Sequence, residues 1–432
     1  MELNAPAPSL ASAIPALEVP RLEALAPTVS SGAPEPAPVL DLIPRAPSPA
    51  PAQTPMASSP PPSVPALSPL APRAPADEPL PEPVETFDQR APEVRSEMLE
   101  RAGGSAETER AVGRALEWLT RHQMPDGSWS GHRFDERCGG CGGEAEVECD
   151  AAMTAVSLLC FLGAGHTPAQ DGPYRAGVAR AIDWLIARQD ASGDLRRGET
   201  MYSQTIAAVA LCEAFSMTRD ERIGRAARRA VSFMLSPRNS PRNSARALDT
   251  SVLGWQVMAV EAARRSGFSV PDDALEPARR WLESTSAVRP GAGRYAHHRG
   301  EAPSAAMTAE AMFVQQLLGR PREEPRMEES ASFILETLPD WDAGAPTYYW
   351  YYATLALFQH QGEAWTRWNE RLVPALLGSQ RTEGPAAGSW DPQDYWSRLG
   401  GRLYQTAVCT LSLEVYYRYR VQTAPSEPGR GP

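Results

Sequence analysis

The sequence has no run of about 18 consecutive apolar residues, the length that an ordinary membrane-spanning helix needs. It also has no basic run that could follow a phosphate backbone, and its net charge is −11, so nucleic acid is not an expected partner. The first residues lack the basic and apolar regions of a signal peptide. We therefore expect a cytoplasmic protein with no integral membrane segment, or a periplasmic one if the start is incomplete.

Aromatic residues are few in the first part of the chain, which is instead rich in proline. Of the 43 prolines, 24 lie within the first 92 residues. A stretch dominated by Pro, Ala and Ser cannot bury enough apolar surface to offset the entropy of ordering it. We expect residues 1–94 to be a disordered Pro/Ala-rich spacer, which could bind a protein partner, followed by one helical domain over 95–420 and a disordered tail over 421–432.

Two kinds of helix alternate after this spacer. Residues 112–119 have apolar positions at i, i+3, i+4 and i+7, typical of an amphipathic helix. Residues 151–162 are apolar nearly all round, so other helices must enclose them. The couplet recurs six times. Its amphipathic members lie at 112–119, 181–189, 226–234, 278–282, 331–335 and 365–380, and its apolar members at 151–162, 205–215, 251–262, 305–318, 348–358 and 404–416.

This alternation predicts an all-α fold, an α/α toroid of six helix-pair repeats. The apolar helices would form an inner ring and the amphipathic helices an outer ring around it. An open solenoid is the alternative, but its helices would not differ so consistently in apolar coverage.

A recurring motif lies at the end of some amphipathic helices. Trp118 is followed by Gln123, Gly127 and Trp129, and Gln380 is followed by Gly388-Ser-Trp390. A weaker copy contains Trp184, Gln189 and Gly193. Over about residues 105–418 the chain resembles the squalene-hopene cyclase and protein prenyltransferase repeat superfamily, whose cyclases carry such QW motifs. It is most similar to an uncharacterised bacterial subset, so the resemblance implies the toroid and leaves the activity open.

The standard chemistries of that superfamily are not expected. The cyclases protonate their substrate with an Asp-x-Asp-Asp motif, whereas here Leu248 stands at the donor position and Asp249 alone is kept. The prenyltransferases hold zinc with Asp, Cys and His. Asp249 could match that Asp, but Ser251 replaces the Cys, and Gln405 or Thr406 stands near the position of the His.

Other acids could supply catalysis. Besides Asp249, the candidates are Asp342 in a loop ahead of an apolar helix, and Glu213 and Glu310 within apolar helices. A buried carboxylate needs a partner or a raised pKa. Pairing with a neighbouring helix would explain the two glutamates equally well, and solvation would explain Asp342.

A cysteine-containing loop precedes the first apolar helix. Cys138 and Cys141 form a Cys-x-x-Cys pair, with Cys149 eight residues on and His132 six residues before. These four residues could bind zinc. A disulfide or a free glycine-rich loop remains open, because the second Cys-x-x-Cys of common zinc modules is missing. A thioester motif is not expected, because Glu144 stands where that chemistry needs Gln.

The starts of the apolar helices suggest a ligand site. In a toroid their N-termini gather at one end, where helix dipoles favour an anionic headgroup. Aromatic side chains there could line a pocket and stabilise cations. Asp150 and Asp249 could instead be helix N-caps. The predicted ligand-binding residues are Asp150, Tyr202, Asp249, Trp255, Tyr348, Tyr351, Tyr352, Tyr404 and Gln405.

Three functional hypotheses follow. The first is a toroid that binds an isoprenoid, lipid or other elongated apolar ligand in its central cavity without the standard acid. The second is an enzyme, a divergent terpene cyclase or prenyl-group transferase. The third is a peptide or protein interaction module tethered by the Pro-rich arm.

Overall fold

The computed structural model describes residues 79–236, 250–286 and 291–421. Regular structure in these ranges is helical, apart from one isolated bridge between Ser286 and Tyr295. Most of the predicted spacer, all but the first residue of the predicted tail, and Asp249 lie outside the described residues. No helix in the described ranges is long and apolar enough to span a membrane.

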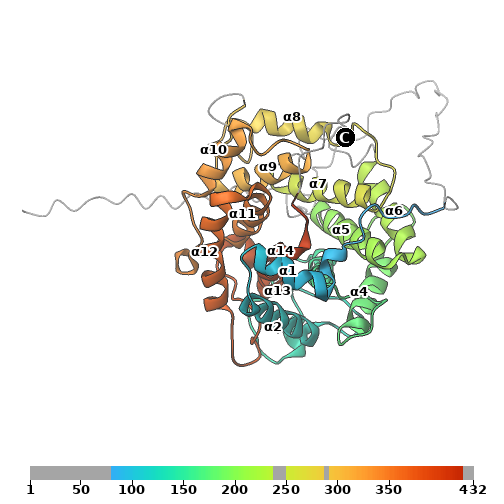
Figure 1. Cartoon of the computed structure of the whole chain (residues 1–432). Helices are drawn as coiled ribbons and strands as arrows, with labels where there is room; N and C mark the ends of the chain where they lie inside the picture. Colours follow the sequence, from blue (N-terminus) through green and yellow to red (C-terminus); the bar gives the residue numbers. More distant parts are fainter. Residues whose placement is uncertain (1–78, 237–249, 287–290, 422–432) are drawn as a thin grey trace, which may run out of the picture. The chain divides into compact units, whose positions relative to one another are not determined.

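Six apolar helices form a closed inner ring, as predicted (Figure 1). Each packs against the next in chain order, and the last packs against the first. Burial explains their composition, because nearly every residue of such a helix faces another helix. They are α3 (Asp150–Gly163), α5 (Met201–Thr218), α7 (Thr250–Arg265), α9 (Ala305–Leu317), α11 (Thr347–His360) and α13 (Tyr395–Leu413).

Six amphipathic helices surround this ring, which confirms the predicted α/α toroid. In Figure 1 they lie around the outside, each beside one or two inner helices. They bury one face and expose charged residues on the other. They are α2 (Ala106–His122), α4 (Arg175–Arg188), α6 (Glu221–Leu235), α8 (Glu276–Thr285), α10 (Pro325–Ile334) and α12 (Gly362–Ser379).

The last inner helix differs from its predicted extent of 404–416. It begins at Tyr395, bends at Gly401, where φ is 71°, and ends at Leu413. A side chain at Gly401 would meet the Gly143 carbonyl oxygen at 2.6 Å, so glycine allows the loop before α3 to pass close to the bend.

Three of the turns from an outer helix to an inner helix share one hydrogen-bonding pattern. After α2, the Gln123 amide donates to the carbonyls of Gly127 in its own turn and Gly177 on α4, both at 2.9 Å. Gln189 and Gln380 make the same pair of bonds after α4 and α12. Each glutamine oxygen also accepts a bond from an arginine of the adjacent outer helix. The turns therefore tie neighbouring outer helices together.

The glycine in each of these turns has a required conformation. Gly127, Gly193 and Gly388 all have φ of 97°, a region that favours glycine. A Cβ atom at Gly193 would lie 2.2 Å from the carbonyl oxygen of Arg229 on α6. The backbone of the turn thus packs directly on the backbone of the next outer helix.

Two terminal segments cover the end of the ring where the inner helices finish. The 3-10 helix η1 (Asp88–Arg90), α1 (Pro92–Arg101) and α14 (Val415–Arg418) contact one another there. Phe87, Gln89 and Arg90 are buried, although composition assigned them to the spacer. Packed structure therefore begins before residue 95.

Candidate functional site

Aromatic side chains gather around the N-terminal halves of the inner helices, and we call this region the aromatic end. Its members come from α5, α7, α11 and α13, so they converge from four sides of the ring. Three of them, Tyr202, Trp396 and Tyr404, are half-buried, and the others are buried. The aromatic end consists of Tyr202, Trp255, Tyr348, Tyr351, Tyr352, Trp396 and Tyr404.

Rings from helices that are not neighbours meet in the middle of the inner ring. Trp255 of α7 stacks on Tyr351 of α11 at a centroid distance of 5.9 Å, across the intervening α9. Tyr348 stacks on Trp396 at 5.6 Å and lies 5.1 Å from Tyr352. These side chains therefore fill the axis of the ring at the aromatic end.

The two other aromatic residues of the Tyr348–Tyr352 run turn away from the axis. The Tyr349 hydroxyl donates to the Ile334 carbonyl on α10 at 2.7 Å. Trp350 packs edge-on against Trp341, 6.0 Å away, in the loop before α11. The run is thus divided between the centre of the ring and the layer outside it, as the helical period requires.

Glu310 is a fully buried carboxylate at the aromatic end. Its Oε1 accepts the backbone N–H of Gly254 at 2.7 Å, and its Oε2 accepts a short hydrogen bond from the Tyr348 hydroxyl. A Cβ at Gly254 would lie 2.5 Å from that Oε1, so glycine makes the approach possible. Burial, and then the Glu310 charge, raise the pKa of Tyr348 well above its ordinary value. The tyrosine therefore keeps its proton and acts as the donor.

Hydrogen bonds extend from this carboxylate to the rim. The Tyr348 hydroxyl lies 3.1 Å from the Ser251 carbonyl oxygen, and Tyr202 donates to the same carbonyl at 2.8 Å. A polar network thus connects α5, α7, α9 and α11. The hydroxyls of Tyr351 and Tyr352 are buried and have no hydrogen-bond partner among the described residues.

The opposite end of the ring is closed by a buried ion cluster. Glu213 accepts hydrogen bonds from Arg90 at 2.8 Å, and from Arg418 and Tyr419 at 3.2 Å. The two guanidinium groups also donate to the carbonyls of Leu162 and Leu159 in the last turns of α3, where the helix dipole favours cations. Glu213 and both arginines are at most 2% exposed.

The protonation state of Glu213 follows from this cluster. Burial raises the pKa of Glu213, but the charges of Arg418 and Arg90 outweigh burial and hold it below the ordinary value. Glu213 is therefore ionised at neutral pH. A carboxylate in that state is not suited to donate a proton.

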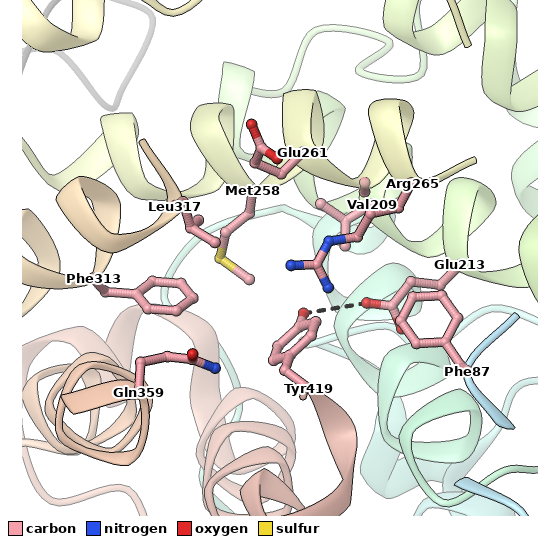
Figure 2. Close-up of a pocket in the computed structure, with 11 residues that line it drawn as sticks. Phe87, Val209, Glu213, Met258, Glu261, Arg265, Phe313, Leu317, Gln359 and Tyr419 are labelled. Atoms are coloured by element: carbon pink, nitrogen blue, oxygen red, sulfur yellow. Dashed lines mark hydrogen bonds between the residues drawn. The ribbon is translucent and has the colours of Figure 1, made fainter. Parts of the chain in front are cut away.

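A small cavity lies beside this cluster (Figure 2). Its volume is about 20 Å³, enough for a single water molecule. Phe87 and Tyr419, from the two terminal segments, form part of its wall. Apolar side chains such as Met258 and Phe313 also point into it. An isoprenoid chain does not fit in this space while the terminal segments are in place.

The remaining predicted residues lie at different places. Asp150 begins α3, but the backbone N–H of Ala151 is capped by Glu199 instead, at 3.3 Å. Gln405 is buried on α13 and accepts a bond from Thr347 at 2.7 Å. Asp342 is exposed in a surface groove beside α12, outside the inner ring.

The cysteine loop lies next to the end of α2. Cys138 and Cys141 are close together, and the third ligand-type side chain beside them is His122. His132 is exposed, and Cys149 lies at the start of α3, where its thiol contacts the Val147 carbonyl. The structure therefore joins two of the four predicted ligands to a histidine that the sequence interpretation did not include.

Comparisons with known proteins gave structural neighbours of low sequence identity. No protein-family model matches the chain, and no curated protein does. A type II terpene cyclase from Scytonema, MstE, is 15% identical with a TM-score of 0.47, covering 72% of this chain and 98% of its own. The GH76A α-1,6-mannanase from Salegentibacter is 12% identical with a TM-score of 0.49, with the same two coverages.

These neighbours differ in activity, and the closed rings of helices in the present chain are evident from its own contacts. Inner helix α13 packs on α3, and outer helix α12 packs on α2. The described residues therefore form an α/α toroid.

Proposed function

We propose that the aromatic end binds an elongated apolar ligand of the isoprenoid class. The main support is that aromatic rings from four inner helices converge at this end. Three of these rings remain half-buried and so can contact a ligand. Ring faces of this kind bind apolar chains while their backing core keeps them rigid. The ligand would lie across Tyr202, Trp396 and Tyr404 and displace the water that covers them.

Polar groups at the same end favour a ligand with a polar head. The buried hydroxyl of Tyr352 has no described protein partner, and such a group needs water or a ligand. The N-termini of the inner helices add partial positive charge there. A carboxylate or diphosphate headgroup is therefore expected to bind better than an alcohol on the same chain.

The route of entry follows from the closure of the opposite end. There the ion cluster of Arg90, Glu213 and Arg418 joins both terminal segments to the ring, and the cavity beside it holds about one water molecule. A ligand is thus expected to bind at the outer surface of the aromatic end, across its half-buried rings, because side chains fill the axis behind them.

Tryptophan fluorescence can measure this binding. We expect farnesyl diphosphate or farnesoic acid to change the emission of the full chain, and Trp396→Ala to raise the Kd about tenfold, the loss of roughly 1.4 kcal/mol of ring contact. The matched control is Trp341→Ala, a half-buried tryptophan on the outer side.

Mass spectrometry of an organic extract of the purified chain gives a second test, and it should detect copurifying lipid. In the fluorescence experiment, the Trp396→Ala and Trp341→Ala variants are compared. Equal affinity in both variants would refute binding at this end.

A second candidate function is proton-transfer catalysis by Glu310. The carboxylate is buried, receives the Tyr348 hydroxyl, and lies among rings that could stabilise a carbocation. In a divergent cyclase, Glu310 would have to take up a proton from solvent before each turnover and would then donate it to an alkene, while Tyr348 would hold the carboxyl group in position.

This candidate is tested by turnover. If the chain converts squalene or an allylic diphosphate, Glu310→Gln should lower the rate at least about 100-fold, because general acid catalysis contributes 10²–10⁴. Ligand affinity should change little. Glu301→Gln, at an exposed glutamate, is the control. No turnover by the unmodified chain would end the catalytic proposal and leave the binding proposal standing.

The interaction-module hypothesis receives less support. It requires an apolar outer face, but among the described residues the exposed large hydrophobic side chains are Val84 and Val94, both outside the twelve ring helices.

A further inference from the structure

Three potential metal ligands from separate parts of the chain meet beside the toroid. His122 is the last residue of α2, and Cys138 and Cys141 belong to the loop that precedes α3. The Cys138 and Cys141 sulfurs are 2.7 Å apart, and His122 Nε2 lies 3.1 Å from the Cys141 sulfur. All three ligand atoms lie within 4.8 Å of one another.

The imidazole of His122 is oriented as a metal ligand would be. Its Nδ1 lies 2.6 Å from the Trp118 carbonyl oxygen. A carbonyl oxygen can only accept, so Nδ1 carries the proton and Nε2 directs its lone pair at the cysteines. Metal-binding histidines commonly donate their second N–H to a carbonyl in this way.

Packing holds that orientation. His122 is 0% exposed and stacks on the Trp118 ring at a centroid distance of 4.1 Å. Phe134 covers it at 5.9 Å. The ring cannot turn away from the sulfurs without disturbing the core around α2.

The cysteine loop is anchored to the ring on its other side. Arg402 of α13 donates from its backbone to the Gly143 carbonyl at 2.7 Å and from Nε to the Gly142 carbonyl at 2.8 Å. Its charge is paired with Asp391 at 2.6 Å. The Cys-x-x-Cys turn is thus fixed in place, and the nearby cation is already neutralised.

We propose that His122, Cys138 and Cys141 bind one zinc ion. At the usual Zn–S distance of about 2.3 Å the two sulfurs would stand about 3.8 Å apart, so the cysteine side chains would separate by about an ångström on binding. Both thiols lose their protons to solvent, and the two thiolates balance the charge of Zn²⁺. Cys138 is half-buried, so water can occupy the fourth position.

The competing state of the same residues is a disulfide. Both cysteines are free thiols in the structure, and their sulfurs are farther apart than the S–S bond of about 2.05 Å. A disulfide would also leave the His122 lone pair without a proton or a metal ion to bind, because disulfide sulfurs carry no hydrogen. The zinc site uses no residue of the aromatic end, so the two proposals stand or fall separately.

Metal analysis of the full chain purified without chelators tests the site. We expect one zinc per chain, and visible absorption of a tetrahedral cobalt–thiolate centre after replacement with Co²⁺. Cys138→Ser should weaken zinc affinity at least about 100-fold, measured by chelator competition. His132→Ala and Cys149→Ser are matched controls, because these residues lie outside the cluster, and both should retain the metal.

Two results would overturn the proposal. One is the absence of stoichiometric zinc from the reduced chain after it has been incubated with zinc. The other is loss of zinc in the His132→Ala or Cys149→Ser variant but not in Cys138→Ser. Since Cys138 is half-buried in a loop, its serine variant is expected to fold, and circular dichroism should confirm that it does.

Discussion

Replacing Arg418 with methionine is expected to lower the free energy of unfolding by about 3–5 kcal/mol. Arg418 is fully buried and shares Glu213 with Arg90. Its removal leaves a buried carboxylate with one cation fewer and frees the Leu159 carbonyl that it now bonds. Denaturant unfolding followed by circular dichroism measures the loss.

An exposed ion pair provides the control for this change. Arg175 pairs with Asp171 at 2.7 Å, and both side chains are mostly solvent-exposed. Arg175→Met should therefore cost less than about 1 kcal/mol. Replacing Arg90, Glu213 and Arg418 together with apolar residues should cost less than removing Arg418 alone, because Glu213 then no longer remains as a buried carboxylate short of a cation. Equal costs for the two single variants would contradict the role given to the cluster.

Substituting alanine for Gly193 is expected to destabilise the toroid by about 2–5 kcal/mol. Part of this cost is the left-handed backbone, where φ is 97°. The larger part is the contact at 2.2 Å between the new Cβ and the Arg229 carbonyl, which cannot move without shifting α6. Thermal and denaturant unfolding both report this change.

Gly113 offers the matched control. It lies within α2, and a Cβ there would have no neighbour within 4 Å. Gly113→Ala should leave stability unchanged or raise it by up to about 1 kcal/mol, because alanine is the better helix former. If Gly193→Ala proved equally harmless, the close approach of turn and helix would not be needed for stability.

The toroid could be predicted from the sequence because the apolar pattern of each helix indicates whether it lies in the inner or the outer ring. An inner helix such as α5 is buried on every side, and an outer helix such as α6 is apolar on one face alone. Each pattern can be read from the residues of one helix, and its repetition in six helix pairs supports the assignment of all of them. The start of packed structure could not be predicted, because the proline-rich composition before residue 95 hides the few residues, such as Leu80 and Phe87, that pack on the ring.

The candidate site was predictable in part for a similar reason. The aromatic residues of α11 stand out in the sequence, and a helical period divides them between the axis and the outer layer. The partners of Glu213 could not be identified, because Arg90 and Arg418 lie 123 and 205 positions away along the chain. Glu310 likewise needed the fold to bring Tyr348 and Gly254 to it.

The histidine of the proposed zinc site illustrates the same limit. His132 lies nearer than His122 to Cys138 in the sequence, and the sequence-based prediction chose the histidine by this spacing. His122 reaches the cysteines because the loop returns to the end of α2, and its tautomer depends on a bond to its own helix at Trp118. Neither fact can be read from residue spacing.

Closure of the inner ring affects how this chain folds during its synthesis. The last inner helix docks on the first, so contacts such as that between Cys160 and Ala407 join residues 247 positions apart. Folding with such a high contact order is slow, because the ends of a long loop must first meet. During synthesis α3 emerges long before α13, and its apolar edge stays uncovered until the last couplet leaves the ribosome. We expect the nascent chain to depend on chaperones over this interval, and truncation before α13 to yield aggregates rather than a smaller toroid.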